Sequence, residues 1–263
     1  MENHRFYLST ISADAADTAR RYGLGLEIAE YCTAYNMDRN FPETDAAVRE
    51  ELAGIARVTL HAPFNELFPC AIDPRARALA ADRFREAIVL AKRYGAEKVV
   101  IHGGYNPRIY FPCWYTEQSA LFWKDFLRED PCVDIVLENV LEEEPEYLLD
   151  IVRAADHPRL GLCLDVGHAN AYSAVPATEW LERLAPYLRH FHLHNNDGSF
   201  DAHAPLGEGG IPMKAFLQSA LALCPTATFA LEVPENTARG ARWLAENGFI
   251  TGERKHGNKG LDR

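Results

Sequence analysis

The sequence lacks the long apolar runs of a membrane protein. It holds no uninterrupted apolar stretch of about eighteen residues, the length that a membrane-spanning helix needs. Its N-terminus, MENHRFYLST, has neither the basic nor the apolar part of a signal peptide. We therefore expect a cytoplasmic protein with no membrane partner.

Cysteine is scarce and has no metal-binding or redox spacing. The chain contains six cysteines, and no two of them form a CxxC pair. Neither a zinc ribbon nor a dithiol redox motif is therefore expected. We expect reduced, mostly buried thiols at all six positions, which are Cys32, Cys70, Cys113, Cys132, Cys163 and Cys224.

Positive charge is also in short supply. The 27 basic and 38 acidic residues give a net charge of −11, which provides no general attraction for a polyanion such as DNA. A polyanion could bind such an acidic protein only at a local basic groove. The GEGG segment at 207–210 has neither the spacing of a dinucleotide-binding loop nor the lysine of a P-loop, so no nucleotide cofactor is expected.

What the chain does have is a regular alternation of short apolar runs and amphipathic segments. Runs such as VTLH, KVVIH and DIVLE have the composition of buried strands. Between two of them, DPRARALAADRFREAIVLAKRYG repeats apolar residues at helical spacing. Strands are predicted at 5–10, 24–29, 57–61, 97–102, 133–138, 160–165, 189–194 and 227–232.

This alternation predicts an α/β fold of the (β/α)8 TIM-barrel class. Repeated strand–helix units require parallel strands with helices outside, and eight units of about 250 residues close a barrel. An open doubly wound sheet is the competing fold, but it gathers its site at one switch point. We expect a single domain over 1–250 rather than two small ones, followed by a polar, loose tail over 251–263.

Potential metal ligands stand at or just after the ends of the predicted strands. In RHFHLH, His190, His192 and His194 share one face while Phe191 and Leu193 share the other, because side chains alternate along a strand. The last, polar residue of other strands likewise turns inward, at the C-terminal mouth where TIM barrels carry their sites. The expected ligands are His61, His102, Glu138, Asp165, His168, His192, Asp201, His203 and Glu232.

Imidazole nitrogens and carboxylate oxygens together favour a divalent transition metal. A single Glu or His at a strand end is more often a hydrogen-bonded structural group. Four carboxylates and five imidazoles in one cavity, however, would leave mutually repelling charges without a cation. We therefore predict a divalent metal cofactor, Mn²⁺, Co²⁺ or Zn²⁺, at about one to three ions per chain.

The motifs at these strand ends also resemble those of a known family. The segments LHAPF, VVIHGG, VLENV, LCLDVGH, HFHLHNNDG, DAHAPLGEGGIP and ALEVPE are similar in order and spacing to those of the xylose isomerase-like TIM-barrel superfamily. That superfamily includes isomerases and epimerases of sugars and sugar phosphates, and also endonuclease IV. The resemblance runs through residues 5–247 and implies the same barrel fold.

The resemblance implies two alternative ligand sets. In the one-metal isomerases and epimerases of the superfamily, the ligands match Glu138, Asp165, His192 and Glu232. The trinuclear zinc site of the endonuclease branch uses those four and the equivalents of His61, His102, His168, Asp201 and His203. This chain carries both sets, so the ligands alone do not choose the chemistry.

The loops favour a sugar over DNA. Arg39, Arg108 and Arg239 are the main cations expected at the active face, whereas a phosphodiesterase that grips duplex DNA needs several phosphate contacts. The loop after the fourth strand is rich in aromatic rings, and Tyr105 and Trp114 are predicted to contact substrate. Such rings can equally stack on a displaced base or only pack the loop.

Two strand residues have less obvious roles. Glu27 is predicted to reach substrate from the inward face of the second strand, with a helix-side salt bridge as the alternative. Asn139, directly after Glu138, is expected to make a structural hydrogen bond.

The sequence thus predicts a divalent-metal-dependent sugar or sugar-phosphate isomerase or epimerase. The metal would stabilise an enediolate, Glu138 and Glu232 would transfer the proton, and His168 would orient substrate or stabilise the oxygen charge. An endonuclease IV-like phosphodiesterase and a non-catalytic sugar- or metal-binding barrel are the alternatives. The expected partner is a small sugar or sugar phosphate rather than nucleic acid, with homo-oligomer formation left open.

Overall fold

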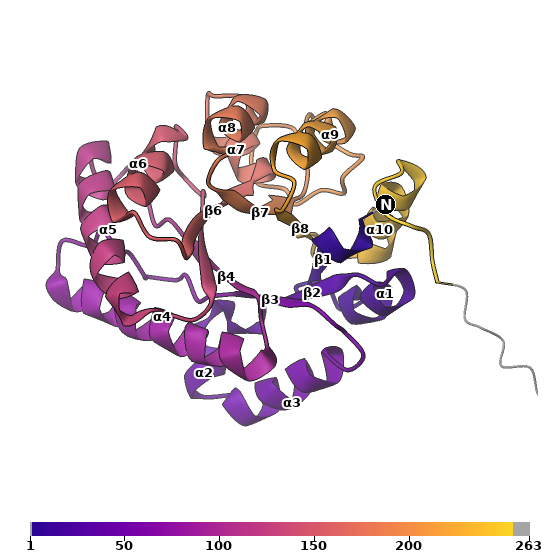
Figure 1. Cartoon of the computed structure of the whole chain (residues 1–263), viewed down its shortest axis with the longest axis horizontal. Coiled ribbons are helices and arrows are strands. Elements are labelled where there is room, and N and C mark those ends of the chain that lie inside the picture. Colours follow the sequence, from indigo (N-terminus) through magenta and orange to yellow (C-terminus); the bar gives the residue numbers. More distant parts are fainter. Residues whose placement is uncertain (1, 255–263) are drawn as a thin grey trace, which may run out of the picture.

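Eight parallel strands close into a barrel in the order β1 to β8, with the helices around its outside (Figure 1). This computed structural model describes residues 2–254 and confirms the predicted TIM barrel. The strands are β1 (Phe6–Ser9), β2 (Gly25–Ile28), β3 (Val58–His61), β4 (Lys98–His102), β5 (Asp134–Glu138), β6 (Leu160–Asp165), β7 (Leu188–Leu193) and β8 (Thr228–Leu231).

The helices occupy the connections between the strands. They are α1 (Ala15–Tyr22), α2 (Ala34–Asp38), α3 (Phe41–Glu51), α4 (Pro74–Tyr94), α5 (Pro112–Phe126), α6 (Glu146–Ala155), α7 (Val166–Tyr172), α8 (Ala177–Leu184), α9 (Met213–Leu223) and α10 (Thr237–Glu246). Short 3-10 helices are η1 (Asn3–Arg5), η2 (Glu30–Cys32) and η3 (Leu127–Glu129). The connection 194–212 between β7 and α9 contains no helix and only an isolated bridge between Asn195 and Ala204.

Local sequence signals set the boundaries of the elements. Helix α4 begins where the Asp73 side chain accepts a hydrogen bond from the Arg75 backbone N–H at 2.7 Å, with Pro74 in the first turn. It ends at Gly95, whose φ of 69° is the left-handed conformation that glycine adopts most readily. Each predicted strand overlaps an observed one, and β7 ends one residue earlier than expected, at Leu193.

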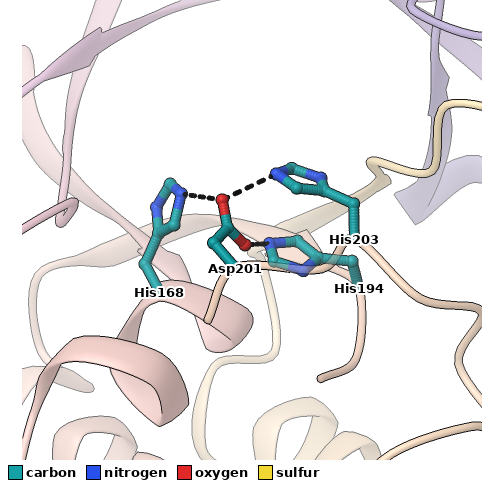
Figure 2. Close-up of side chains that lie close together, drawn as sticks. All are labelled: His168, His194, Asp201 and His203. Carbon is teal, nitrogen blue, oxygen red and sulfur yellow. Dashed lines mark hydrogen bonds and ion pairs between the residues drawn. The ribbon is translucent and has the colours of Figure 1, made fainter. Parts of the chain in front are cut away.

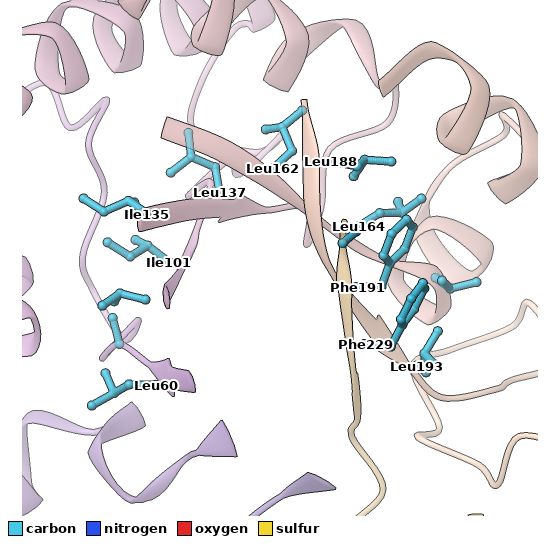
Figure 3. Packing of buried hydrophobic residues seen from close by; sticks show 14 of the residues in the cluster. Leu60, Ile101, Ile135, Leu137, Leu162, Leu164, Leu188, Phe191, Leu193 and Phe229 are labelled. Atoms are coloured by element: carbon cyan, nitrogen blue, oxygen red, sulfur yellow. The ribbon is translucent and has the colours of Figure 1, made fainter. Parts of the chain in front are cut away.

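Alternation along the strands separates two buried layers. Outward side chains pack beneath the helices, where the ring of Phe191 stacks on Phe229 at 4.8 Å (Figure 3). The Phe191 ring also meets Phe216 of α9 at 6.2 Å. Inside the barrel, Val100, Val136 and Cys163 form a separate small apolar cluster. Because that cluster is small, buried polar side chains occupy part of the barrel axis below the mouth.

The first and last strands, β1 and β8, meet at the barrel seam. This seam is held by strand pairing and by the carboxylate of Asp14. The strands pair in parallel, with Tyr7 opposite Ala230. Above them, Asp14 accepts hydrogen bonds from the Thr237 hydroxyl at 2.7 Å, the Thr237 backbone N–H at 2.9 Å and the Ala238 N–H at 3.1 Å. A side chain beside α1 therefore satisfies the first N–H groups of α10, where negative charge is favoured.

The start of the predicted tail lies against the barrel. The Thr251 N–H donates to the Asn3 side chain at 2.8 Å, and the Arg254 N–H donates to the Arg21 carbonyl at 2.8 Å. The rest of the expected loose tail, 255–263, lies outside the described residues. None of the helices within 2–254 combines the length and apolar character needed to cross a membrane.

The cysteines follow the expectation only in part. All six are free, and Cys70, Cys163 and Cys224 are buried. The expected burial is wrong for Cys113 and Cys132, which are exposed. They lie in the first turn of α5 and in the turn before β5, where the chain runs at the surface.

Candidate metal centre and active site

The nine predicted ligands converge at the C-terminal mouth of the barrel. Together with His194, which was not among the nine, they form three neighbouring groups, and within each group one possible ligand atom per residue lies within 4.8 Å of the others. The first group is His61, His102 and Glu138; the central group is Glu138, Asp165, His192 and Glu232; and the outer group is His168, His194, Asp201 and His203. Metal binding by these groups stays a prediction.

The central group is built around one imidazole. Nδ1 of His192 lies 3.2 Å from Glu138 Oε1, 3.5 Å from Glu232 Oε2 and 3.8 Å from Asp165 Oδ2. Despite these neighbours, Nδ1 is buried and makes no well-formed hydrogen bond. A nitrogen with no hydrogen-bond partner, facing three carboxylates, fits a divalent cation.

Glu27 lies beneath this group, and its contact with substrate stays a prediction. Its carboxylate is fully buried, with Oε1 2.9 Å from Nε2 of His192. Its Oε2 accepts from the Thr59 hydroxyl at 2.8 Å and contacts His190 Nε2 at 2.9 Å. Neither Glu27 Oε1 nor His192 Nε2 makes a well-formed hydrogen bond, so their 2.9 Å contact is a close approach of two buried groups. Its position favours a supporting role for Glu27 beneath the His192 ring.

The first group shares Glu138 with the central group. Oε2 of Glu138 lies 3.1 Å from Nε2 of His61 and 3.6 Å from Nε2 of His102. Nδ1 of His61 lies 2.9 Å from the Ala62 carbonyl, which makes Nδ1–H the favoured tautomer and directs the Nε2 lone pair toward the site. The ring of Phe64 stacks on His102 at 4.3 Å and limits its movement.

Asn139 and the start of α7 fix Asp165. The Asn139 amide donates to the Asp165 carbonyl at 3.0 Å and accepts from the Asp165 N–H at 2.9 Å, which is the expected structural hydrogen bonding. Asp165 in turn caps α7, because its Oδ1 accepts from the His168 N–H at 2.7 Å. The turn that positions the Asp165 carboxylate therefore also positions His168.

The outer group includes one residue that the sequence analysis placed on the inward face but did not count as a ligand. His194 is the first residue after β7, and its Nε2 lies 3.0 Å from Asp165 Oδ1 and 3.6 Å from Asp201 Oδ1. Figure 2 shows His168, His194 and His203 arranged around the Asp201 carboxylate. The HxHxH pattern of β7 was the available signal, but strand alternation alone does not tell how far past the strand it continues.

Opposite charges hold these groups together when no cation is bound. Burial favours neutral imidazole, but Asp201 and the neighbouring carboxylates raise the pKa of His203 to about 9. Burial also disfavours the charged carboxylate of Asp165, yet His168 and His194 lower its pKa to about 2. At His102 burial outweighs the attraction of Glu138 and lowers the pKa to about 3. A divalent cation would therefore displace protons from some histidines of the site.

Tyr105 and Trp114, which were predicted to contact substrate, have packing contacts in the structure. Tyr105 is buried, with its ring 4.9 Å from Tyr115 and 5.4 Å from Tyr147. The Trp114 N–H donates to the Cys70 carbonyl at 2.8 Å, and its ring is partly buried against the core. These contacts favour the alternative in which both rings pack the loop after β4.

The site is open on one side. The side chains of His203, His102, Asp201 and Glu232 are exposed by 26%, 19%, 19% and 11%, whereas Asp165 and His192 are fully buried. Solvent therefore reaches the site past Glu232 and the two more exposed histidines. The buried members hold the ligand geometry from beneath.

The fold and the order of these residues match a family described as "xylose isomerase-like TIM barrel", over residues 24–247. Two relatives are an uncharacterised protein of Methanocaldococcus jannaschii, 35% identical over 169 residues (59% of this chain and 56% of that protein), and the fructoselysine 3-epimerase of Shigella flexneri, 26% identical over 167 residues (59% and 58%). The matched part therefore covers less than two thirds of each relative.

Solved structures extend the similarity to nearly the whole barrel. A D-tagatose 3-epimerase-like protein has a TM-score of 0.76 and 25% identity, with 92% of this chain and 96% of that chain covered. A protein from Thermus thermophilus, whose crystal was soaked with ZnCl2, has a TM-score of 0.75 and 27% identity, with 93% and 98% covered.

Proposed function

This chain belongs to the xylose isomerase-like TIM-barrel family, and we propose that it is a divalent-metal-dependent isomerase or epimerase that acts on a ketose. The observation that carries the proposal is the pair of carboxylates from β5 and from the end of β8. Glu138 Oε1 and Glu232 Oε2 flank Nδ1 of His192 at 3.2 and 3.5 Å. Two carboxylates beside a predicted cation site can act as the general base and the general acid that move a proton from and to carbon.

Inversion at carbon requires two groups that exchange a proton with opposite faces of the substrate. One of Glu138 and Glu232 would accept the proton from the carbon beside the carbonyl, and the other would donate a proton to the opposite face. A cation held by the central group would supply Lewis-acid stabilisation of the negative oxygen that forms between these two steps. Both ring nitrogens of His168 are engaged, Nδ1 with the Asn139 carbonyl at 2.9 Å and Nε2 with Asp201 Oδ2 at 3.2 Å, so we propose no direct contact between His168 and substrate.

Carbon 3 is the position that the relatives favour. One relative is a fructoselysine 3-epimerase, and one similar structure is described as D-tagatose 3-epimerase-like. In both names the stereocentre changed is the one next to a ketose carbonyl. A proton at that carbon is acidic enough for a carboxylate to remove once the carbonyl oxygen is stabilised.

The charges near the mouth favour an uncharged ketose over a ketose phosphate. Of the three arginines expected at the active face, Arg239 is already paired with Glu208. Arg39 ends α2, and Arg108 lies in the loop after β4. Five carboxylates, counting Glu27, stand in or under the ligand groups, and a phosphate brought close to them would be repelled unless cations offset their charge.

Phosphodiester hydrolysis is the second candidate, because the first and outer groups add two possible cation positions beside the central one. Clustered cations can activate water and hold the leaving oxygen of a phosphoester. A net charge of −11 argues against tight binding to DNA. The two reactions are separable by a direct experiment.

The test compares both activities in one metal-loaded preparation. The protein is incubated in deuterated water with a panel of ketoses and ketose phosphates, and in parallel with duplex DNA that contains an abasic site. We expect deuterium at carbon 3 of at least one ketose, together with its 3-epimer, and loss of both after chelation. DNA strand cleavage without deuterium uptake in any sugar would overturn the proposal in favour of hydrolysis.

A further inference from the structure

His194 stands between the central and outer groups. It is fully buried, and its ring stacks on His203 at a centroid distance of 3.8 Å and an interplanar angle of 12°. Its Nε2 forms a hydrogen bond with Asp165 Oδ2 at 3.1 Å and lies 3.6 Å from Asp201 Oδ1, while its Nδ1 has no hydrogen-bond partner. The family resemblance assigns the outer group three ligands and does not include this residue.

The two other imidazoles of the outer group present lone pairs to one carboxylate oxygen. Nδ1 of His168 lies 2.9 Å from the Asn139 carbonyl, and Nδ1 of His203 lies 2.8 Å from the Glu232 carbonyl. These carbonyls can only accept, so each Nδ1 carries the hydrogen in the neutral ring and each Nε2 carries the lone pair.

Both of those Nε2 atoms point at Asp201 Oδ2, from 3.2 Å for His168 and 3.0 Å for His203. Lone pairs that face each other at this distance repel unless a second hydrogen on each ring, or a cation between the groups, separates them. The other oxygen, Asp201 Oδ1, is buried without a hydrogen-bond partner. The arrangement in Figure 2 is therefore one that a cation would complete.

The spacing of these atoms suits a tetrahedral zinc ion. Ligands about 2.0–2.1 Å from a tetrahedral zinc stand roughly 3.3 Å apart. Asp201 Oδ2 lies 3.0 and 3.2 Å from Nε2 of His203 and His168, and Asp201 Oδ1 lies 3.6 Å from Nε2 of His194. Three imidazoles and one carboxylate are a zinc-type set, whereas the carboxylate-rich central group suits a cation of higher coordination number with room for substrate.

We propose that His194 is the fourth protein ligand of a closed zinc site with His168, Asp201 and His203, and that this site fastens the β7–α9 connection over the barrel mouth. Four protein ligands leave no position for substrate or for a reacting water, which is the mark of a structural zinc. Asp201 and His203 belong to the connection 194–212, His168 to α7, and His194 follows β7 directly. The ion would join a segment that has no helix to two fixed elements of the barrel.

The alternative role for His194 is a simple hydrogen bond from Nε2–H to Asp165. The variant His194→Gln separates the two, because an amide can still donate to Asp165 but is a poor zinc ligand. Ser199→Ala is the matched loop control, since the Ser199 hydroxyl donates to Asp197 within the same connection. Circular dichroism of the metal-free proteins would verify that each variant is folded.

The first readout is the metal itself and needs no substrate. Wild type and variants are loaded with Zn²⁺ or Co²⁺, desalted, and analysed for bound metal and for the visible absorption of tetrahedral Co²⁺. We expect His194→Gln to retain one ion fewer per chain and to lose the tetrahedral band, while Ser199→Ala keeps both. Equal metal content and an unchanged band in His194→Gln would overturn the proposal and leave His194 as a hydrogen-bond donor.

The second readout is the accessibility of the connection to protease. Phe200 is 61% exposed on this segment and is a site for chymotrypsin. Zinc should slow cleavage after Phe200 by at least about tenfold in wild type and Ser199→Ala, by holding the segment closed, but not in His194→Gln. Equal protection in His194→Gln would show that His194 does not help to hold the segment.

A second variant keeps the idea testable if His194→Gln fails to fold. A Cβ at Gly167 would overlap the His194 ring. Gly167→Ala should therefore displace the ring without removing it, and weaken retention of the tetrahedral ion while leaving all four ligands in the sequence. Full retention in a folded Gly167→Ala protein would count against His194 as a ligand. None of these outcomes depends on which sugar, if any, is turned over, so failure here is distinguishable from failure of the proposed function.

Discussion

The carboxylate of Glu27 lies 2.9 Å from Nε2 of His192, on the side of the ring opposite to the three carboxylates around Nδ1. A carboxylate on the far nitrogen fixes both the tautomer and the orientation of a metal-binding imidazole. We therefore propose that Glu27 is a positioning residue for the central group and acts through His192.

Replacing Glu27 tests this relationship. We expect Glu27→Gln to weaken binding of the central cation about 10- to 100-fold, since the amide cannot hold His192 Nε2–H as a carboxylate does. Competition with a chromophoric chelator measures the effect. Glu97→Gln is the control, because Glu97 accepts from the Tyr7 hydroxyl at 3.1 Å and, within residues 2–254, forms no ion pair with a histidine of the three groups. Unchanged affinity in folded Glu27→Gln would refute the role.

Asp165 and Glu232 should separate metal retention from proton transfer. Asp165→Asn should weaken metal binding, because it removes a charged oxygen from the buried centre of the site. Glu232→Gln should lower the rate of solvent-proton exchange in a ketose by at least about a hundredfold even when metal is bound. Metal content and deuterium uptake are measured on the same samples. Normal exchange in metal-loaded Glu232→Gln would remove Glu232 from catalysis.

Asn139 should matter for folding as well as for the site. Asn139→Ala leaves the buried N–H and carbonyl of Asp165 without partners, at a cost of about 1–3 kcal/mol in the free energy of unfolding. Thermal unfolding of the metal-free protein should show a Tm lowered by several degrees. Asn170→Ala, which removes a half-buried amide that bonds to Asn196, serves as the comparison. A variant as stable as wild type would contradict the structural role.

The Asp14 carboxylate should make the barrel seam sensitive to acid. Burial disfavours its charged form, but the hydrogen bonds from Thr237 and the neighbouring donors hold its pKa below the usual 3.8. A depressed folded-state pKa contributes stability that is present above the unfolded pKa and is lost as the pH falls through the folded value. The relevant window is therefore below about pH 4.

The matching variant is Asp14→Asn, studied in chelator-treated protein. At pH 7 it should lower the free energy of unfolding by about 1 kcal/mol, the usual effect of losing a cap, and the gap to wild type should shrink as the pH falls below 4. Urea unfolding at several pH values measures both. A gap that stays constant down to pH 2 would show that the charge of Asp14 is not responsible.

The barrel and the six candidate ligands on or next to strands follow from local rules, whereas His168, Asp201 and His203 were placed by the motifs LCLDVGH and DAHAPLGEGGIP. Strand alternation turns the last polar residue of each run inward, and parallel strands bring their ends to one mouth. The roles of Glu27 and His194 needed three-dimensional information. Whether Glu27 reaches substrate or lies beneath His192 depends on its depth along the barrel axis, which the stagger between strands determines.

The aromatic loop after β4 was harder to interpret for another reason. A tyrosine that packs against two other tyrosines and one that stacks on a sugar have the same local sequence. Tyr105 meets Tyr115 of α5 and Tyr147 of α6, and those contacts form only when separate helices pack together. The sequence therefore shows that a tyrosine is present in the loop, but not whether its ring is covered by protein or left free for substrate.

Glu138 divides its two oxygens between neighbouring groups, with Oε1 toward His192 and Oε2 toward His61 and His102. Cations in the first and central groups would share this one carboxylate, so their binding free energies cannot be independent. The first ion to bind would orient Glu138 for the second but also withdraw part of its negative charge. Zinc titration of the metal-free protein should therefore deviate from independent binding. A cooperative isotherm would show that the orientation of Glu138 is the larger effect, and an anticooperative one that the loss of negative charge is larger.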